Sequence, residues 1–356
     1  MSDKQEQAKQ LLKKIAMYGR LSADDASALF DSFVSNDGDG QQATDAQLGA
    51  YLFSTGLRDI SQEELTGAAT SLRKLMTPID LSELASPDNI IDTCGTGGSG
   101  VDSFNTSTAC ALIVAAAGQL VAKHGNRAAS SRSGSADVLK ALGISLECGM
   151  EQLRLCAKET NFCFLFAPLY HPATKRAVQI RKELSVRTIF NYLGPLLNPA
   201  GAKLQLMGVS QAKMLEPIAH ALQQLGTKRA LVVRGKDGLD EITLTGPTIA
   251  YSVTKDRVEQ ITLTPEQFGL RTVSFDQVKG MEPDKAASKI RSIFNGEVGP
   301  YRDLLVLNAG AALYVAGRSG SIEEGMLLAT QTIDSGKAKE NLGRILRICG
   351  DHALQA

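Results

Sequence analysis

The sequence lacks several features that mark nucleic-acid-binding proteins. Its 356 residues include no tryptophan and only 5% aromatic residues, and 38 Lys and Arg balance 38 Asp and Glu, so the formal net charge is zero. Proteins that hold a phosphate backbone usually carry a surplus of Lys and Arg. The balance therefore argues against an extended nucleic-acid surface, although it leaves room for a local basic pocket.

Long hydrophobic runs are absent too. The longest stretch with few charges, residues 103–122, is interrupted by polar side chains, and its apolar part covers only residues 109–117. A membrane-spanning helix needs about 20 apolar residues. The first residues, 1–6, are polar and lack the apolar segment of a secretory signal. We therefore expect a buried, alanine-rich helix at 109–117 and no membrane partner.

The cysteines lack the spacing of a metal or redox motif. They are Cys94, Cys110, Cys148, Cys156, Cys163 and Cys349, and none forms a C-x-x-C pair. Zinc ribbons and thioredoxin-like sites are thereby excluded. Cysteine outside such motifs usually behaves as a small buried hydrophobe. We expect reduced thiols in a cytoplasmic protein.

Glycine, by contrast, is abundant, with 33 residues, and hydrophobic residues make up 43% of the chain. This hydrophobic content is typical of a folded globular protein, and at about 150 residues per domain the length predicts about two domains. Residues 1–85 show helical periodicity, and Ser61 and Glu64 have the spacing of a helix capping box. The N-terminal part is therefore predicted to be a small all-helical domain.

From residue 89 onward, short apolar segments alternate with helical ones. We predict strands at 90–94, 120–122, 163–166, 206–209, 230–233 and 304–307, and helices at 106–118, 136–142, 152–159 and 214–225. Such alternation predicts an α/β fold, in which helices flank both faces of a mostly parallel central sheet. Ligands in these sheets bind at the carboxyl ends of the strands. The turns at those ends are therefore the places to look for a site.

The first such turn, residues 95–100, has the sequence Gly-Thr-Gly-Gly-Ser-Gly. It fits G-x-G-x-x-G, but a dinucleotide site needs an acidic residue after the next strand, where this chain has the cationic segment 123–127. Bare backbone N–H groups followed by Asn105, Ser107 and Thr108 at a helix N-terminus suit a phosphate. An ordinary glycine turn with routine helix caps remains the alternative.

Two further turns complete the pattern. Residues 123–131 hold two cations, an imidazole, an asparagine and two serines next to the first turn, which suggests a ligand with two phosphate groups. The third turn ends in Asp240 and Glu241. A carboxylate pair facing a diphosphate suits magnesium, directly or through water, although adjacent acids are more often plain surface charge.

Motifs along nearly the whole chain resemble those of anthranilate phosphoribosyltransferases. They lie, in order, at residues 92–98, 104–108, 123–127 with Ser130 and Ser131, 171–172, 186–191, 193–196, 198–199, 238–241 and 308–309. The most specific is Lys-His-Gly-Asn-Arg at 123–127, because the related pyrimidine nucleoside phosphorylases carry a different second loop.

The resemblance implies a magnesium-dependent glycosyltransferase of tryptophan biosynthesis. Its reaction joins phosphoribosyl pyrophosphate to the amine of anthranilate and releases pyrophosphate. It also implies that residues 1–86 and the helical segment 172–199 form one domain, and that residues 87–171 and 200–356 form the large α/β domain that binds the donor. Members of the family usually pair as homodimers through the helical domain.

The resemblance assigns a role to each matching residue. It assigns the sugar diphosphate to Gly95, Gly98, Ser99, Ser103, Asn105, Ser107, Thr108, Lys123, Gly125, Asn126, Arg127, Ser131 and Ser135. It assigns anthranilate to Gly95, His124, Asn126 and Arg181, and Mg²⁺ to Ser107, Asp240 and Glu241. Lys123 would stabilise the leaving group and Arg181 would hold the acceptor carboxylate, so these two are the predicted catalytic residues.

The chain departs from the family pattern at two positions. Ser99 stands where the family usually has Asp, and Ser103 stands where it usually has Thr. The first change removes a negative charge beside the diphosphate and its metals. Two other functions stay open: the same fold acting on another aromatic amine or a nucleobase, and a non-catalytic paralogue that binds nucleic acid.

Overall fold

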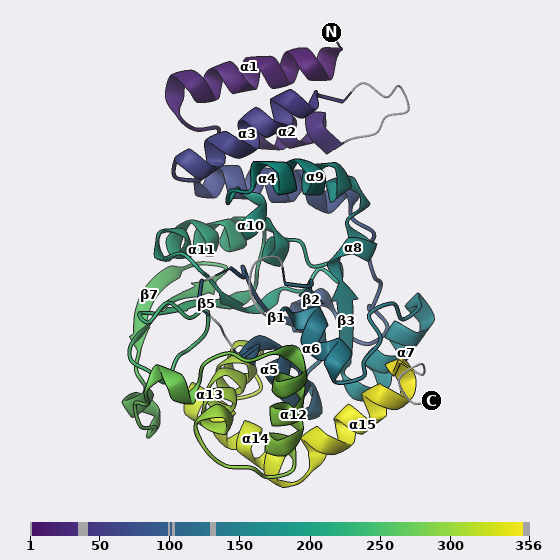
Figure 1. The fold of residues 1–356 in the computed structure, drawn as a ribbon, viewed down its shortest axis with the longest axis vertical. Helices are drawn as coiled ribbons and strands as arrows, with labels where there is room; N and C mark the ends of the chain where they lie inside the picture. The colour runs from purple at the N-terminus through teal and green to yellow at the C-terminus, as the bar shows by residue number, and fades with distance from the viewer. Residues whose placement is uncertain (1, 35–41, 99, 102–103, 129–132, 352–356) are drawn as a thin grey trace.

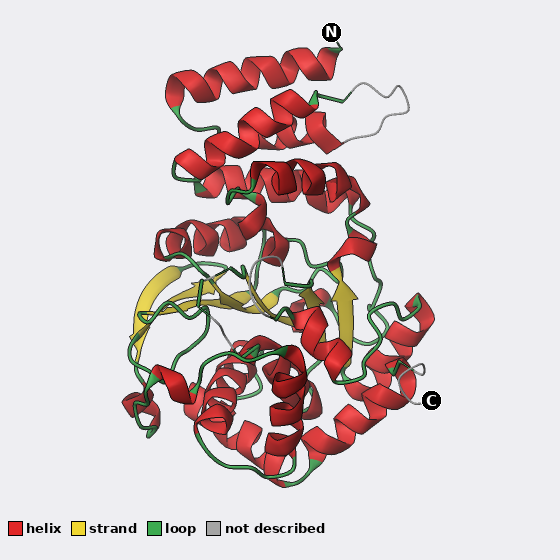
Figure 2. Ribbon diagram, viewed as in Figure 1, coloured by secondary structure: helices red, strands yellow, loops and turns green. Residues whose placement is uncertain are grey.

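The computed structural model describes residues 2–34, 42–98, 100–101, 104–128 and 133–351. A bundle of helices stands above a twisted sheet, and a second group of helices covers the opposite face of the sheet (Figures 1 and 2). None of the described helices is both long enough and apolar enough to cross a bilayer.

The upper helices come from two distant parts of the chain. They are α1 (Asp3–Tyr18), α2 (Ala23–Val34), α3 (Asp45–Leu57) and α4 (Gln62–Leu75), then α8 (Ala167–Tyr170), α9 (Lys175–Leu184) and α10 (Phe190–Leu193). The predicted capping box at Ser61 and Glu64 begins α4, with the reciprocal hydrogen bonds that define it. At the crossing of α2 and α4, a Cβ on Gly67 would lie 2.1 Å from the Ala23 carbonyl oxygen, so glycine permits this close approach.

The sheet has seven strands in the order β3-β2-β1-β4-β5-β6-β7. They are β1 (Ile91–Gly95), β2 (Val121–Gly125), β3 (Phe162–Phe166), β4 (Leu204–Gly208), β5 (Arg229–Gly235), β6 (Thr248–Thr254) and β7 (Val258–Leu263). The first five in space pair in parallel, and β6 and β7 add an antiparallel hairpin. Gly95 and Gly208 are partners at the ends of β1 and β4, so the carboxyl ends are level there.

Alternate residues of the strands enter different cores, as the two-residue period of a strand requires. Leu231 and Val233 pack among the lower helices, whereas Ala230 and Val232 pack against the upper ones. The remaining helices are α5 (Thr106–Ala116), α6 (Ser135–Ala141), α7 (Met150–Thr160), α11 (Leu215–Gln224), α12 (Pro283–Phe294), α13 (Pro300–Val315), α14 (Ile322–Asp334) and α15 (Lys337–Cys349). Figure 1 places α11 above the sheet and α5 and α12–α15 below it.

The predicted fold class is confirmed: a helical N-terminal part and a mostly parallel sheet flanked by helices. One predicted strand is wrong. Residues 304–307 belong to the helix α13, which begins at Pro300 and is buried on nearly every side. A short apolar run cannot distinguish a buried helix from a buried strand. The β6–β7 hairpin was not predicted, and the six cysteines are free, five of them buried.

Candidate functional site

A cavity of about 310 Å³ opens at the carboxyl ends of the parallel strands. Most of the predicted site residues line it: Gly95, Gly98, Asn105, Ser107, Lys123, His124, Gly125, Asn126, Arg127, Ser135, Arg181, Asp240 and Glu241. Thr108 does not line it, because its side chain is fully buried one residue further along α5. Ser99, Ser103 and Ser131 fall outside the described residues.

Bare glycine backbone brings the first and third turns together. A Cβ on Gly95 would lie 2.9 Å from Oδ2 of Asp240, and a Cβ on Gly208 would lie 1.8 Å from the Asp240 carbonyl oxygen. Real Cβ contacts are never that short, so any side chain on Gly208 would push the acidic turn away. The two glycines therefore position the acidic turn against the strand that carries the glycine turn.

The two carboxylates are held in an environment that favours a cation. Glu241 is buried, and burial, reinforced by the neighbouring Asp240 carboxylate, raises its pKa to about 8. Its Oε1 has no hydrogen-bond partner among the described residues. Burial also raises the pKa of Asp240, although the backbone of Gly97 donates a hydrogen bond that opposes the rise. An unpaired buried carboxylate oxygen beside a second acid fits an oxygen-seeking divalent ion.

The protein by itself supplies only part of such an ion's ligands. No group of three or more His, Cys, Asp or Glu side chains among the described residues is arranged to hold a metal. Magnesium usually binds through one or two carboxylates and completes its shell with water and substrate phosphates. Asp240, Glu241 and the Ser107 hydroxyl, which line the same cavity, fit that incomplete kind of site.

Lys123 places a buried positive charge on the cavity wall. Its ammonium donates to the Thr93 carbonyl oxygen and, over 3.2 Å, to the Ser107 hydroxyl. Burial lowers the pKa of Lys123, and the nearby Asp92 carboxylate opposes that change. Asp92 itself accepts from the His124 backbone N–H at 3.2 Å and from the Asn198 amide at 2.8 Å. Burial still raises the Asp92 pKa to about 6.

The His124 ring lines the cavity, but both of its nitrogens are engaged within the protein. Nδ1 lies 3.1 Å from the Gly194 carbonyl oxygen, and Nε2 lies 3.1 Å from Nε2 of His171. A neutral ring that donates from Nδ1 must accept at Nε2, so His171 is the donor of the second bond. His124 therefore offers the cavity the carbon edge of its ring and no free N–H. His171 had no assigned role in the sequence analysis.

Arg181 presents an uncommitted guanidinium. It comes from α9, lies 5.5 Å above the centre of the Phe190 ring, and is half-buried. Burial lowers its pKa. Its guanidinium makes no hydrogen bond or ion pair with any residue that the structure describes. A planar guanidinium in this state can bind both oxygens of a ligand carboxylate.

The second turn is tied to the helices on either side of it. Asn105, in a left-handed conformation with φ of 62° before α5, donates from its amide to the Ser133 carbonyl (3.1 Å) and hydroxyl (2.8 Å) oxygens. The Ser135 hydroxyl at the start of α6 donates to the Asn126 carbonyl oxygen at 3.2 Å. A Cβ on Gly125 would lie 2.2 Å from that hydroxyl oxygen and 2.9 Å from Cε2 of Phe164, so a larger residue would require both side chains to move.

Comparison with known proteins agrees with this geometry. Residues 9–76 match the helical bundle domain of a glycosyl transferase family, and residues 87–339 match the a/b domain of that family. Among curated relatives, the anthranilate phosphoribosyltransferase of Bradyrhizobium sp. is 44% identical over 96% of this chain and 98% of its own length. That of Brevibacillus brevis is 48% identical over 87% of this chain and 89% of its own. The chain belongs to the anthranilate phosphoribosyltransferase family.

Solved structures of the family show the same architecture. The enzyme of Thermus thermophilus is 38% identical and matches with a TM-score of 0.86 over 95% of this chain and 99% of that one. The enzyme of Saccharomyces cerevisiae, solved in complex with PRPP and Mg, is 24% identical and matches with a TM-score of 0.84 over 96% of this chain and 97% of that one. The second likeness concerns the fold alone.

The histidine pair predicts a specific loss of stability in acid. Burial lowers the pKa of His124 to about 3 and that of His171 to about 4, against about 6.5 in an unfolded chain. Between the folded and unfolded pKa values, the unfolded state binds more protons than the folded state. The contribution of the pair to the free energy of unfolding is therefore complete above about pH 6.5 and is lost as the pH falls towards 4. Each histidine adds up to about 1.4 kcal/mol per pH unit to the fall in unfolding free energy.

Urea unfolding at about pH 7.5 and about pH 5 checks this. Wild type should lose more stability in acid than His171→Gln, which removes one of the two titrating rings. His220→Gln on α11 serves as the control and should keep the wild-type loss. Equal losses for His171→Gln and wild type would contradict a neutral, buried pair.

Proposed function

We propose that this chain transfers the phosphoribosyl group of phosphoribosyl pyrophosphate to the amine of anthranilate. The products are N-(5-phosphoribosyl)anthranilate and pyrophosphate, and the reaction belongs to tryptophan biosynthesis in the cytoplasm. The observation that carries the proposal is a single cavity whose lining joins a glycine turn, a buried ammonium and a carboxylate pair to the Arg181 guanidinium. The first three groups suit a diphosphate with its metal, and the guanidinium suits the anthranilate carboxylate.

Within this proposal the described residues divide by ligand. The donor would contact Gly95, Gly98, Asn105, Ser107, Lys123, Gly125, Asn126, Arg127 and Ser135, all on the cavity lining. The acceptor would lie between Arg181, Asn126 and the ring edge of His124. Mg²⁺ bound to Asp240, Glu241 and Ser107 would supply positive charge against the diphosphate.

The chemistry is a displacement at the ribose C1 carbon. The C1–O bond to pyrophosphate breaks, the C1–N bond to anthranilate forms, and the amine proton is lost to solvent. An aniline nitrogen is already neutral at pH 7, so the chain needs no strong general base. Arg181 aligns the amine by holding the carboxylate, and Lys123 stabilises the charge on the leaving group.

The decisive measurement follows anthranilate fluorescence in the presence of phosphoribosyl pyrophosphate and Mg²⁺. We expect decay with wild type and a rise in the KM for anthranilate of about tenfold or more in Arg181→Ala, because a charge-assisted contact is lost. Lys182→Ala, on the exposed neighbouring position, should behave as wild type. A flat wild-type trace beside an active control enzyme would refute the function, and an unchanged KM in Arg181→Ala would refute that assignment.

Comparing acceptors separates the remaining alternatives. Arg181 favours an acceptor that carries a carboxylate, so an aromatic amine without one, or a nucleobase, should turn over poorly. Efficient turnover of such an acceptor would show that the chain is a transferase of the same fold with a different acceptor. Salt-dependent binding of single-stranded DNA without turnover would instead support a paralogue that binds nucleic acid.

The metal assignment has its own test. Asp240→Asn together with Glu241→Gln should raise the Mg²⁺ concentration needed for half-maximal activity by about tenfold or more, because two negative ligands are removed. Glu282→Gln, an exposed acid before α12, is the control. A magnesium titration that is identical in the double variant and wild type would count against these two residues as ligands.

We also propose that the bundle, residues 1–86 with 172–199, is a domain that pairs with a second copy of the chain. Its outer surface carries apolar side chains that no described residue covers. Leu57 and Phe53, one turn apart on α3, are 74% and 46% exposed, and Val178 on the adjoining α9 and Val186 after it are also exposed. Exposed apolar clusters of this kind mark protein interfaces.

Light scattering tests the pairing. Wild type should have the mass of a dimer, and Leu57→Glu should shift it towards the monomer, because a buried unpaired charge is costly in an interface. Leu327→Glu, at a similarly exposed leucine on α14, should leave the mass unchanged. A monomeric wild type would contradict the proposal.

A further inference from the structure

We propose that Arg187 is a positioning residue for the donor: it holds the glycine turn from outside the cavity, and helix α3 holds Arg187. The inference rests on the proposed function, since it concerns the binding of phosphoribosyl pyrophosphate. Nothing in the reasoning from sequence assigned Arg187 a role beyond its place in a motif.

The guanidinium of Arg187 reaches across to the backbone of the glycine turn. Nη2 donates to the Gly98 carbonyl oxygen and, at 3.4 Å, to that of Gly97. Nη1 donates to the Ser210 hydroxyl at 3.0 Å. Ser210 in turn is joined to Thr96 by two hydrogen bonds, of 3.0 Å between hydroxyls and 2.9 Å from its backbone N–H. Both ends of the segment 96–98 are therefore tied to one cation.

Arg187 and Ser210 stand outside the cavity lining, whereas residues 94–98 form part of it. Arg187 therefore acts on a ligand through the turn.

Where the structure describes it, the turn's own backbone is held on one side only, by the Gly97 N–H, which donates to the Asp240 carboxylate. Gly97 and Gly98 have φ angles of 63° and 65°, and glycine has no side chain to restrict them. Among the described residues of the turn, the last backbone hydrogen bond to the sheet is from Thr96 N–H to the Gly208 carbonyl oxygen at 3.0 Å. In each peptide plane the N–H points away from the C=O. Holding the Gly97 carbonyl thus fixes the Gly98 N–H on the opposite side.

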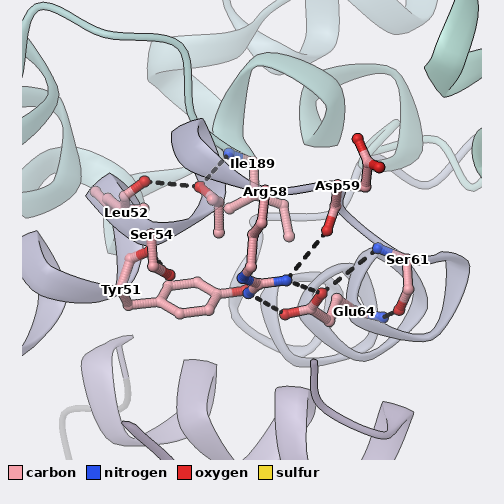
Figure 3. Close-up of polar contacts among 9 residues, drawn as sticks. Tyr51, Leu52, Ser54, Arg58, Asp59, Ser61, Glu64 and Ile189 are labelled. Atoms are coloured by element: carbon pink, nitrogen blue, oxygen red, sulfur yellow. Dashed lines mark hydrogen bonds and ion pairs between the residues drawn. The ribbon is translucent and has the colours of Figure 1, made fainter. Parts of the chain in front are cut away.

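Arg187 is itself fixed by the C-terminal turn of α3. The Ile189 backbone N–H donates to the Thr55 hydroxyl at 3.1 Å, a bond drawn in Figure 3. A Cβ on Gly56 would lie 2.8 Å from the Arg187 carbonyl oxygen. The absence of a side chain at Gly56 thus lets the segment that carries Arg187 lie directly on the helix.

A buried ion pair fixes this end of α3. Arg58 donates from both terminal nitrogens to the two oxygens of Glu64, each at 2.6 Å, and the Glu64 side chain is fully buried (Figure 3). The pair is bidentate, the strong geometry for these groups. Glu64 also closes the capping box of α4, so the pair joins the end of α3 to the start of α4. Contacts therefore run continuously from the bundle core to the glycine turn.

Removing the guanidinium tests the proposal directly. Calorimetric titration with phosphoribosyl pyrophosphate and Mg²⁺ should show a donor Kd raised about tenfold or more in Arg187→Ala, because the donor must then order the turn itself. The KM for anthranilate should change by less than about twofold. Arg187→Lys keeps a charge and donors without the planar fork, so it should recover part of the loss.

Arg176→Ala is the matched control. Arg176 also ties α9 to the N-terminal part of the bundle, because it donates to Asp45 (2.5 Å), Gln42 (3.1 Å) and the Ala43 carbonyl oxygen (2.5 Å). It makes no hydrogen bond or ion pair with the described part of the glycine turn. It should change the melting temperature without changing the donor Kd.

A pair of glycine variants on α3 tests the coupling without touching Arg187. Gly56→Ala forces the Arg187 carbonyl away and should raise the donor Kd in the same direction as Arg187→Ala. Gly49→Ala, on the same helix, meets only a methyl carbon of Ile180 at 3.7 Å and should leave the donor Kd unchanged.

The outcomes separate this proposal from the proposed function. An unchanged donor Kd in both Arg187→Ala and Gly56→Ala would overturn the proposal. A rise in the anthranilate KM of Arg187→Ala as large as the rise in its donor Kd would also overturn it. So would an equal rise in the donor Kd of Arg176→Ala. A wild type that binds the donor without consuming anthranilate would refute the function and leave the Arg187 test intact.

Discussion

The site depends on the contact between an acidic turn and bare backbone at the ends of two parallel strands. Asp240 lies so close to Gly95 and Gly208 that any larger residue at Gly208 would displace it. Because β1 and β4 end level with each other, this contact aligns the glycine turn and the carboxylates along one edge of the sheet. As a result, Gly95, Asp240 and Glu241 line one cavity.

Both burial and the neighbouring charges determine the pKa values of the ionisable groups around the cavity. Lys123 and Asp92 are both buried, and burial moves their pKa values in opposite directions, while each opposes the change in the other. Glu241 has no such partner among the described residues, and its pKa is raised to about 8. The cavity therefore has the buried Lys123 amine on one side and an unsatisfied carboxylate oxygen of Glu241 on the other. That asymmetry suits a diphosphate accompanied by a cation.

The helical bundle completes the site through the segment that follows β3. This segment carries Arg181, which lines the cavity and whose guanidinium has no hydrogen-bond partner among the described residues. It also carries Arg187, whose guanidinium donates to the glycine turn and to the Ser210 hydroxyl. Two arginines six positions apart thus differ in role because only one reaches backbone acceptors. The end of α3 around Thr55 and Gly56 holds the segment that carries Arg187, so Arg187 is the arginine that reaches those acceptors.

Local periodicity and glycine placement were enough to predict the α/β class, the turns at the strand ends and the residues of the carboxylate pair. Each of these features depends on residues that are neighbours in the sequence. They did not distinguish residues 304–307 as a helix, since an apolar run buried on all sides looks the same in either form. His124 was predicted to contact the ligand, and that stays a prediction; only the folded chain shows that both of its ring nitrogens are engaged with Gly194 and His171. Contacts between residues far apart in the chain, such as that of Arg187 with Gly98, have no local sequence signal, so they are settled only when the sheet and the bundle pack together.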